Sequence, residues 1–177
     1  MEVLEPGQDW KIAALRDFFH VHFFIGENME YNKEYMNMAY DEALKANNIG
    51  EIPVGCVLVN NDYVIRTHNL KEINNCVLDH AELLAIREAS DKIKNWRLDD
   101  FDMYITLEPC PMCASAIKQA RIRNVYCGCR TSDEDHELCT RVFSTVDRNN
   151  YVNFVTEKDR NRCEKLLKDF FEKRRNM

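Results

Sequence analysis

The sequence is poor in glycine and proline and lacks a long apolar segment. Five glycines and four prolines among 177 residues exclude a collagen-like or low-complexity chain. No apolar run approaches the ~18–20 residues that a membrane-spanning helix needs. The chain begins with Glu2 and Glu5, and the stretch Ile12–Gly26 is interrupted by charges. Because a secretory signal begins with a basic segment, we expect a soluble, cytoplasmic protein that does not associate with a membrane.

Cysteine is too sparse for a disulfide scaffold. Eight cysteines in 177 residues are well below the ~8–10% typical of short disulfide-rich chains. Without an export signal the thiols should stay reduced, so their spacing is interpreted as metal ligation or core filling. Cys127 and Cys129 share one face of a predicted strand. They are candidates for a second metal site, although buried thiols are the commoner outcome.

Two families of catalytic loops are also missing. Gly50 and Gly55 have the spacing of a phosphate-binding loop, but Cys56 and Val57 follow in place of Lys and Ser or Thr. The sequence contains no GxGxxG and no GxSxG segment. Nucleotide hydrolysis and serine-hydrolase chemistry are therefore excluded.

The length and the alternation of patterns indicate one helix-covered α/β domain. At 45% hydrophobic and 31% charged residues, the chain has the composition of a globular protein. Helices are predicted from Tyr31 to before Gly50 and over 80–94, 109–120 and 158–175, and strands over 53–60, 63–67, 101–107, 124–129 and 151–156. Ser132–Glu137 is predicted to be an acidic loop before a short helix. The alternation predicts a three-layer α/β/α sandwich with a mixed central sheet of about five strands.

Residues 1–29 differ from the remainder. This segment holds a cluster of phenylalanines without a clean period: Phe18, Phe19, Phe23 and Phe24. An amphipathic helix over Trp10–Phe24 is one interpretation, and an extension ahead of a natural start at Met29 is the other. We expect the extension to be dispensable and residues 30–177 to form the working domain.

The strongest signal is His80-Ala81-Glu82 followed by Pro109-Cys110-Pro111-Met112-Cys113. Each half lies at the predicted start of a helix, where free N–H groups favour a thiolate over a thiol. Cys110 and Cys113, at i and i+3, lie on one helix face and are able to reach one metal ion. With His80 they make three ligands, which for zinc leaves a fourth position open for water. A structural zinc site would normally close with a fourth Cys or His.

Glu82 is predicted to act on that water. Two residues beyond His80 its side chain diverges from the metal, so it is better placed as a proton shuttle than as a ligand. Cys-x-x-Cys alone would also fit a redox pair or half of a zinc ribbon. The combination of H-x-E with P-C-x-x-C is the pattern of zinc-dependent nucleobase deaminases.

Positive charge is concentrated in two segments of a chain with net charge −6. Residues 109–130 hold four basic and no acidic residues, and 158–177 hold eight basic and four acidic ones. A solvated helix face is one interpretation, and a strip that follows a polynucleotide is the other.

The sequence resembles the bacterial-type tRNA-specific adenosine deaminases, within the cytidine and deoxycytidylate deaminase superfamily. The similarity runs from about Tyr35 to Arg175. The segments that carry it are Glu51-Ile-Pro-Val-Gly, His68-Asn69-Leu70, His80-Ala-Glu, Trp96-Arg-Leu, Leu107-Glu-Pro-Cys-Pro-Met-Cys, and Leu166-Leu-Lys-Asp-Phe-Phe with Arg174-Arg175.

This resemblance implies a cytidine deaminase-like fold and conversion of adenosine to inosine at the wobble position of a tRNA anticodon. It implies one Zn²⁺ per chain on His80, Cys110 and Cys113, with Glu82 as proton shuttle. It also implies that Asn69 and the Ala81 backbone hold the base, that Phe171 and Arg175 lie near the anticodon loop, and that the protein is a homodimer.

Two segments depart from the family pattern. After Cys129-Arg130 the family usually has a glycine-containing loop, and this chain has the acidic segment 131–139 instead. Before the His-Ala-Glu motif the family usually has Pro-Thr-Ala, and this chain has Val77-Leu78-Asp79. An acidic segment next to the site disfavours the binding of RNA phosphate groups. The alternative hypothesis is therefore deamination of a free base or nucleoside (guanine, cytosine or adenosine). A zinc-stabilised RNA-binding protein without turnover is a third hypothesis, and Glu82 argues against it.

Overall fold

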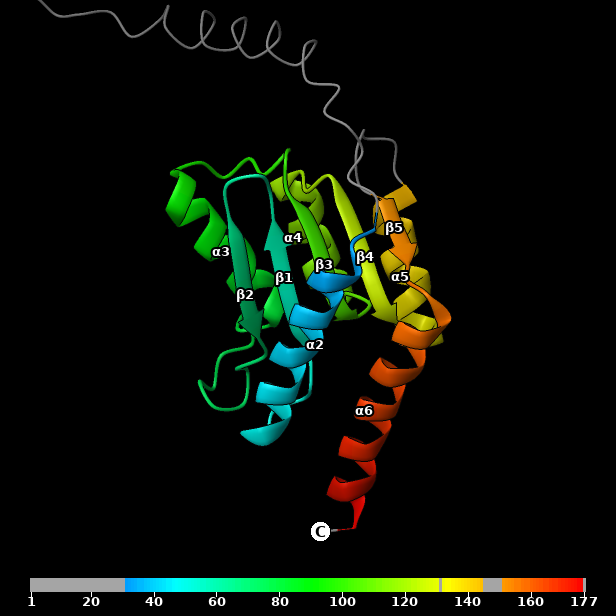
Figure 1. Cartoon of the computed structure of the whole chain (residues 1–177). Coiled ribbons are helices and arrows are strands. Elements are labelled where there is room, and N and C mark those ends of the chain that lie inside the picture. Colours follow the sequence, from blue (N-terminus) through cyan, green and yellow to red (C-terminus); the bar gives the residue numbers. More distant parts are fainter. Residues whose placement is uncertain (1–30, 131, 145–150, 177) are drawn as a thin grey trace, which may run out of the picture. The chain divides into compact units, whose positions relative to one another are not determined.

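The computed structural model describes residues 31–130, 132–144 and 151–176. Helices and strands alternate along them, as predicted (Figure 1). The elements are α2 (Lys33–Asn48), β1 (Gly55–Val59), β2 (Val64–His68), α3 (Ala81–Ile93), β3 (Asp102–Leu107), α4 (Pro111–Ala120), β4 (Asn124–Cys129), α5 (Asp133–Ser144), β5 (Tyr151–Phe154) and α6 (Glu157–Arg175).

The described strands form one mixed sheet in the order β2-β1-β3-β4-β5. β1 is antiparallel to β2 and β3, whereas β3, β4 and β5 are mutually parallel. All strands except β1 therefore run in one direction and end at the same edge of the sheet. The predicted mixed sheet of about five strands is confirmed.

Helices cover both faces of this sheet, with α2 and α6 on one face and α3 and α4 on the other (Figure 1). Gly55 of β1 lies against α2 so closely that a Cβ there would be 2.0 Å from the carbonyl oxygen of Ala39. At Gly128 of β4 a Cβ would be 2.6 Å from the Sγ of Cys163 in α6. These glycines allow the helices to approach the strands, and the three-layer sandwich is confirmed.

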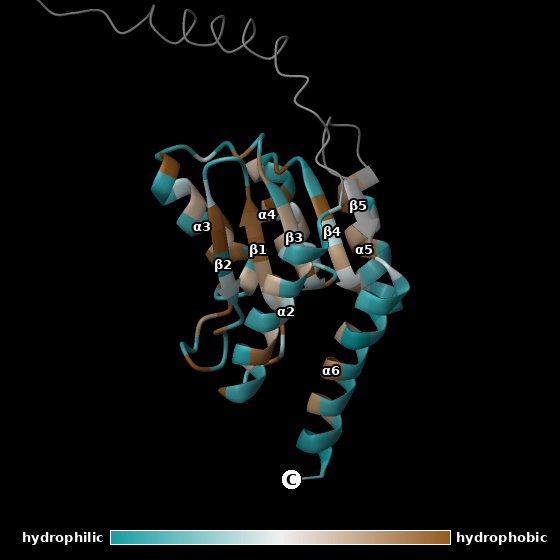
Figure 2. Ribbon diagram, viewed as in Figure 1, coloured by the Kyte–Doolittle hydropathy of each residue, from teal (hydrophilic) through white to brown (hydrophobic). Residues whose placement is uncertain are grey.

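The main apolar core lies between the sheet and the pair α3 and α4. Ala81, Ala85 and Ala89 recur every four residues along α3 and are fully buried against the strands. Leu58 of β1 and Ile105 of β3 belong to the same core, and burying each such side chain contributes about 1.5–3 kcal/mol. Figure 2 shows hydrophobic residues on β1, an interior strand of the sheet, and a largely hydrophilic α6.

Local sequence signals account for several helix ends. The Asn32 side chain accepts a hydrogen bond from the N–H of Glu34, 2.8 Å away, and caps α2. Pro111 occupies the first turn of α4, where its missing N–H is not needed. α3 and α4 end at Lys94 and Arg121, whose left-handed φ values of 54° and 62° terminate the helices.

The acidic segment after β4 differs from its prediction. Ser132–Glu137 is predicted as a loop, but the helix α5 already begins at Asp133. Acidic side chains in the first turn of a helix are stabilised by the positive end of the helix dipole. The acidic residues that led to the prediction of a loop therefore favour the start of a helix. An i,i+4 ion pair between Glu137 and Arg141 adds to it.

The predictions for residues 1–29, including the helix over Trp10–Phe24, lie outside the described residues. Among the helices that are described, none combines the length and the hydropathy that crossing a membrane requires.

Candidate functional site

Three side chains with metal-binding atoms meet at the edge where β2 and β3 end. The Nδ1 of His80 lies 3.8 Å from the Sγ of Cys110 and 3.5 Å from the Sγ of Cys113. All three ligand atoms lie within 4.8 Å of one another, and within the described part of the chain no other such group of three is found. The structure therefore brings together residues that are separated by about thirty positions in the sequence.

The starts of two helices place these side chains. His80 is the N-cap residue of α3, and Cys110 is the N-cap residue of α4. Neither side chain makes a capping hydrogen bond, so both remain directed at the cluster. Cys113 follows in the first turn of α4. Because both helices begin at the carboxyl ends of parallel strands, the cluster occupies the edge of an α/β sheet where ligands usually bind.

The electrostatics of the cluster favour a cation. A hydrogen bond from the Cys113 thiol, together with contact with His80, lowers the pKa of Cys110 to about 4. The same hydrogen bond, together with burial, raises the pKa of Cys113. The half-buried Cys110 and the buried Cys113 therefore favour one thiolate and one thiol. A divalent cation would remove the mutual repulsion and allow both to ionise.

The separations also fit zinc. Zn–S bonds of about 2.3 Å and Zn–N bonds of about 2.0–2.1 Å at tetrahedral angles would place a ring nitrogen and a sulfur about 3.6 Å apart. The two observed separations, 3.5 and 3.8 Å, lie on either side of this value. The three side chains are of the types that zinc prefers, and their separations would suit that ion.

Glu82 lies beside the cluster without belonging to it. It is in the first turn of α3, and only 4% of its surface is exposed. Burial and the negative charge of Cys110 raise its pKa to about 7. A carboxyl group in this environment is suited to accept and return a proton near neutral pH.

Asn69 and Ala81 lie next to these groups. Asn69 directly follows β2 and is 5% exposed. The hydroxyl of Thr67 donates to the carbonyl oxygen of Ala81 at 2.7 Å, and the N–H of Leu70 donates to the carbonyl oxygen of Asp79 at 3.0 Å. These two bonds hold the end of β2 against the start of α3, so both predicted base-contacting residues lie at the cluster.

Phe171 and Arg175 are not brought to the cluster. Both are on α6, which covers the opposite face of the sheet and runs past the ends of β3 and β4 (Figure 1). Phe171 is 44% exposed and packs edge-on against the buried Phe170, with ring centroids 5.4 Å apart. Their predicted role at the anticodon loop remains a prediction.

Sequence reasoning missed a second carboxylate near the cluster. Glu108, two residues before Cys110, is buried, and both of its oxygens lie within 2.9 Å of the Nδ1 of His136 in α5. This pair fastens α5 beside the cluster. The only sequence signal was a carboxylate directly before Pro-Cys, which by itself has no defined partner.

The other cysteines contribute no second metal group among the described residues. Cys127 and Cys129 are free, buried thiols, as the alternative interpretation expects. Burial raises the pKa of Cys127 and holds it as a neutral thiol.

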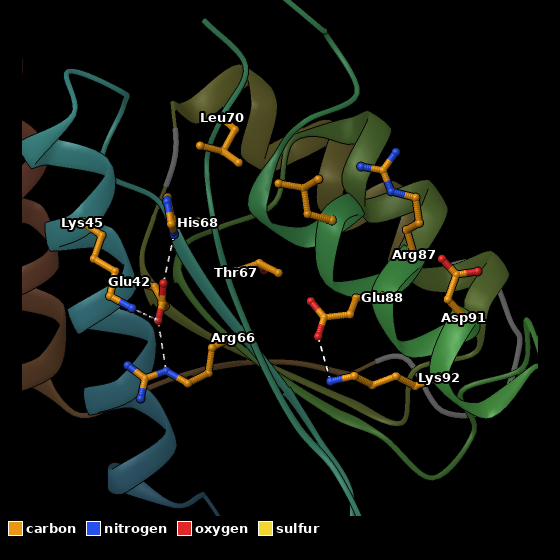
Figure 3. Close-up of a pocket in the computed structure, with 11 residues that line it drawn as sticks. Glu42, Lys45, Arg66, Thr67, His68, Leu70, Arg87, Glu88, Asp91 and Lys92 are labelled. Atoms are coloured by element: carbon orange, nitrogen blue, oxygen red, sulfur yellow. Dashed lines mark hydrogen bonds and ion pairs between the residues drawn. The ribbon is translucent and has the colours of Figure 1, made fainter. Parts of the chain in front are cut away.

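A separate cavity of about 850 Å³ opens at the outer edge of β2, between α2 and α3 (Figure 3). Glu42 lies in its wall and accepts hydrogen bonds from Lys45, Arg66 and His68. On the other side a Glu88–Lys92 ion pair spans 2.8 Å. The cluster residues do not line this cavity, and its charges largely compensate one another.

Comparison with known proteins agrees with the site. A tRNA-specific adenosine deaminase of Bacillus subtilis is 45% identical over 101 residues, which cover 56% of this chain and 63% of that protein. One from Buchnera aphidicola is 34% identical over 151 residues, 83% of this chain and 99% of that protein. A solved structure from a study of A-to-I editing by tRNA:A34 deaminases superposes with a TM-score of 0.69 at 33% identity, covering 77% of this chain and all of that one.

The segment matched in the B. subtilis protein is less than two thirds of that protein's length. Residues 29–129 match the sequence profile of the cytidine and deoxycytidylate deaminase zinc-binding region, which is more than half of this chain and includes the whole cluster with Glu82. The chain therefore belongs to the family of proteins with the cytidine and deoxycytidylate deaminase zinc-binding region.

Proposed function

We propose that the protein hydrolytically deaminates adenosine to inosine at the wobble position of a tRNA anticodon. The observation that carries the proposal is the buried Glu82 carboxyl beside the zinc-type cluster of His80, Cys110 and Cys113. Similarity to tRNA-specific adenosine deaminases over the same residues supports the choice of substrate.

In the proposed mechanism His80, Cys110 and Cys113 hold one zinc ion per chain. When bound, zinc supplies the Lewis acidity that turns water into a nucleophile near neutral pH. A Glu82 carboxylate oxygen accepts a proton from the attacking water and returns it to the departing amine. Water and adenosine thereby give inosine and ammonia. Burial of Glu82 keeps this proton exchange inside the site.

Substrate contacts are proposed at two places. Asn69 and the Ala81 backbone hold the extruded base beside the cluster. Phe171 and Arg175, on the projecting end of α6, contact the anticodon loop, where an exposed aromatic ring offers stacking and the basic residues meet phosphate. The exposure of Phe171 supports this assignment.

Deamination of a free base or nucleoside is the alternative, and α5 favours it. Asp133, Glu134 and Glu137 are all exposed on this helix, which the Glu108–His136 contact fastens beside the cluster. Their charge opposes a phosphate backbone. RNA binding without turnover is the weakest hypothesis, because binding alone requires no buried carboxyl at Glu82.

The deciding experiment measures ammonia release and inosine formation with an anticodon stem-loop, in parallel with free guanine, cytosine and adenosine. Turnover of the stem-loop at a kcat/KM far above the free compounds supports the proposal. Turnover of a free base or nucleoside alone would replace it with the alternative, and no turnover of any of them would favour RNA binding.

Replacing Lys173 and Arg175 by Ala should weaken binding of the stem-loop and flatten its salt dependence. Each lost phosphate contact lowers the slope of log K against log salt by ~0.7 for single-stranded RNA, so the pair should lower it by about 1.4. Arg174 is left in place because it donates to the Gly50 carbonyl at 2.8 Å and covers the Phe170 ring.

The matched control replaces Lys92 and Lys94, at the far end of α3, by Ala. It removes the same number of positive charges from a position away from the proposed RNA path. The control should retain the slope of the parent protein. Flat and superimposable salt titrations of kcat/KM for both double variants and the parent would reject the tRNA proposal, since a small neutral ring releases no counterions.

We also propose a cytoplasmic homodimer. Support comes from apolar side chains next to the site: Ile73, Val77 and Leu78, in the loop before His80, are 51%, 62% and 55% exposed. Neighbouring exposed apolar residues commonly mark an interface. Light scattering should give twice the chain mass of 20.9 kDa, and a single-chain mass at assay concentrations would contradict the dimer.

Residues 30–177 are proposed as the deaminase domain, with residues 1–29 dispensable. A chain that begins at Met29 should unfold at the same temperature and turn over like the full chain, because the motifs and the N-cap Asn32 of α2 are retained. It also retains Tyr31, whose hydroxyl donates to Asp159 at 2.8 Å. Lower solubility or activity of the shortened chain would show that the phenylalanine cluster packs on the domain.

A further inference from the structure

Glu51 is a fully buried carboxylate in the turn between α2 and β1. Its Oε2 accepts a hydrogen bond from the Nδ2 of Asn69 at 3.0 Å, and its Oε1 accepts one from the N–H of Ile73 at 2.8 Å. The N–H of Glu51 in turn donates to the carbonyl of Ala46 at 2.9 Å, so both ends of the residue are anchored. One carboxylate therefore ties the end of β2 to the loop that leads to His80.

This contact determines which way the Asn69 amide points. Both oxygens of Glu51 act as acceptors here, so Asn69 turns its NH₂ group toward Glu51 and its carbonyl Oδ1 away. The Asn69 backbone is held as well, because its N–H donates to the Val54 carbonyl at 3.0 Å. Among the residues that the structure describes, none donates to the Asn69 Oδ1.

Asn69 lies beside the base of the loop that leads to His80. The hydrogen bond from Leu70 to Asp79 closes the base of the loop, and Asn69 and His80 flank it on either side. Asn69 is thus one residue outside the closed loop, next to the cluster. In the proposed function Asn69 contacts the base, so the group turned away from Glu51 is the one available to a nucleoside.

We propose that Glu51 is a positioning residue that sets the hydrogen-bonding sense of Asn69, so that Asn69 offers an acceptor to an N–H or O–H donor of the bound nucleoside. The inference rests on the proposed function, since it takes Asn69 as a base-contacting residue. Glu51 itself touches no substrate and acts only through Asn69.

Glu51→Gln tests the proposal, because a glutamine at this position has only one acceptor. The Ile73 backbone N–H is always a donor, so it keeps its hydrogen bond to the side-chain carbonyl oxygen at position 51. The side-chain NH₂ group at that position then faces Asn69. Asn69 must then rotate its amide by half a turn and offer NH₂ to the nucleoside. We expect kcat/KM for an anticodon stem-loop to fall about 10–100-fold, mainly through KM, with little change in melting temperature.

The double variant Glu51→Gln with Asn69→Asp exchanges the two side-chain types and should restore activity. Asn69→Asp alone sets two carboxylates against each other and should lose both activity and stability. Combined with Glu51→Gln, the aspartate accepts from the Gln NH₂ group and again turns an acceptor outward. The double variant should recover at least tenfold in kcat/KM over either single variant. No recovery, together with a parent-like melting temperature, would overturn the proposal.

NMR supplies a readout that does not depend on catalysis. In the parent protein one side-chain amide proton of Asn69 should be shifted downfield by its bond to the Glu51 carboxylate, and the signal is assigned by its loss in Asn69→Asp. Glu51→Gln should move it upfield. An unchanged signal together with unchanged kinetics would also overturn the proposal.

Glu42→Gln is the matched control. Glu42 is another buried carboxylate that accepts on both oxygens, from Lys45 and Arg66 on one and His68 on the other. Its substitution should lower the melting temperature and leave KM within about twofold. If KM rises as much as in Glu51→Gln, the effect is general destabilisation and the proposal fails. Failure of the proposed function would show differently, as an inactive parent whose Asn69 signal still responds to Glu51→Gln.

Discussion

Glu82→Gln should retain about one zinc ion per chain and lose about 10²–10⁴-fold in kcat. The proposed ligands His80, Cys110 and Cys113 are unchanged, so metal affinity should persist. Gln has nearly the shape of Glu but carries no proton acceptor of suitable pKa, so the transfer from water to the leaving amine loses its shuttle. Zinc content by elemental analysis and single-turnover inosine formation, measured on the same preparation, separate the two effects.

The control for this substitution is Glu88→Gln on the same helix. Glu88 pairs with Lys92 at the surface of α3, away from the cluster, so zinc content and kcat should match the parent. Loss of zinc from Glu82→Gln would show that Glu82 is a ligand, and the assignment of the cluster would be wrong. Full activity in Glu82→Gln would place the shuttle on another residue.

Cys113→Ala should abolish both zinc binding and turnover and should also destabilise the domain. Two remaining ligands hold zinc far more weakly than three, and the cluster joins the starts of α3 and α4 to each other. A ligand present at about 1,000 times its Kd stabilises the folded state by about 4 kcal/mol, and the variant loses that contribution. His80→Ala should behave in the same way.

Thermal unfolding with and without a chelator tests this expectation. The parent should lose melting temperature when zinc is removed, and Cys113→Ala should not respond. Cys129→Ala is the control, because Cys129 is a buried thiol outside the cluster that donates to the Thr106 carbonyl. Stoichiometric zinc in Cys113→Ala, or an equal loss of zinc in Cys129→Ala, would contradict the ligand set.

Much of the site is predictable because its signals are local. Cys110 and Cys113 lie one helical turn apart, and Pro111 marks where that helix begins, so their shared face follows from the sequence. The position of Glu82 two residues after His80 likewise separates it from the ligands. The strand pattern predicts a mixed sheet because alternating helices require parallel neighbours with crossover connections.

Other features depend on which segments the fold places together. His80 meets the cysteines only because β2 and β3 flank β1 and run in the same direction, so that the two helices that follow them begin at one edge. The bond between Glu51 and Asn69 joins positions eighteen residues apart, and that between Glu108 and His136 joins positions twenty-eight apart.

Residue types and periodicity therefore predicted the three cluster residues, the neighbouring Glu82 and the layers of the fold. Tertiary structure decided the orientation of Asn69 and the placement of Phe171 away from the cluster. Hydrophobic periodicity predicts which face of a helix or strand is buried. It does not predict the hydrogen-bond partner of a buried carboxylate, because that partner is distant in the sequence. That partner decides which atoms of a neighbouring side chain are left to meet a substrate.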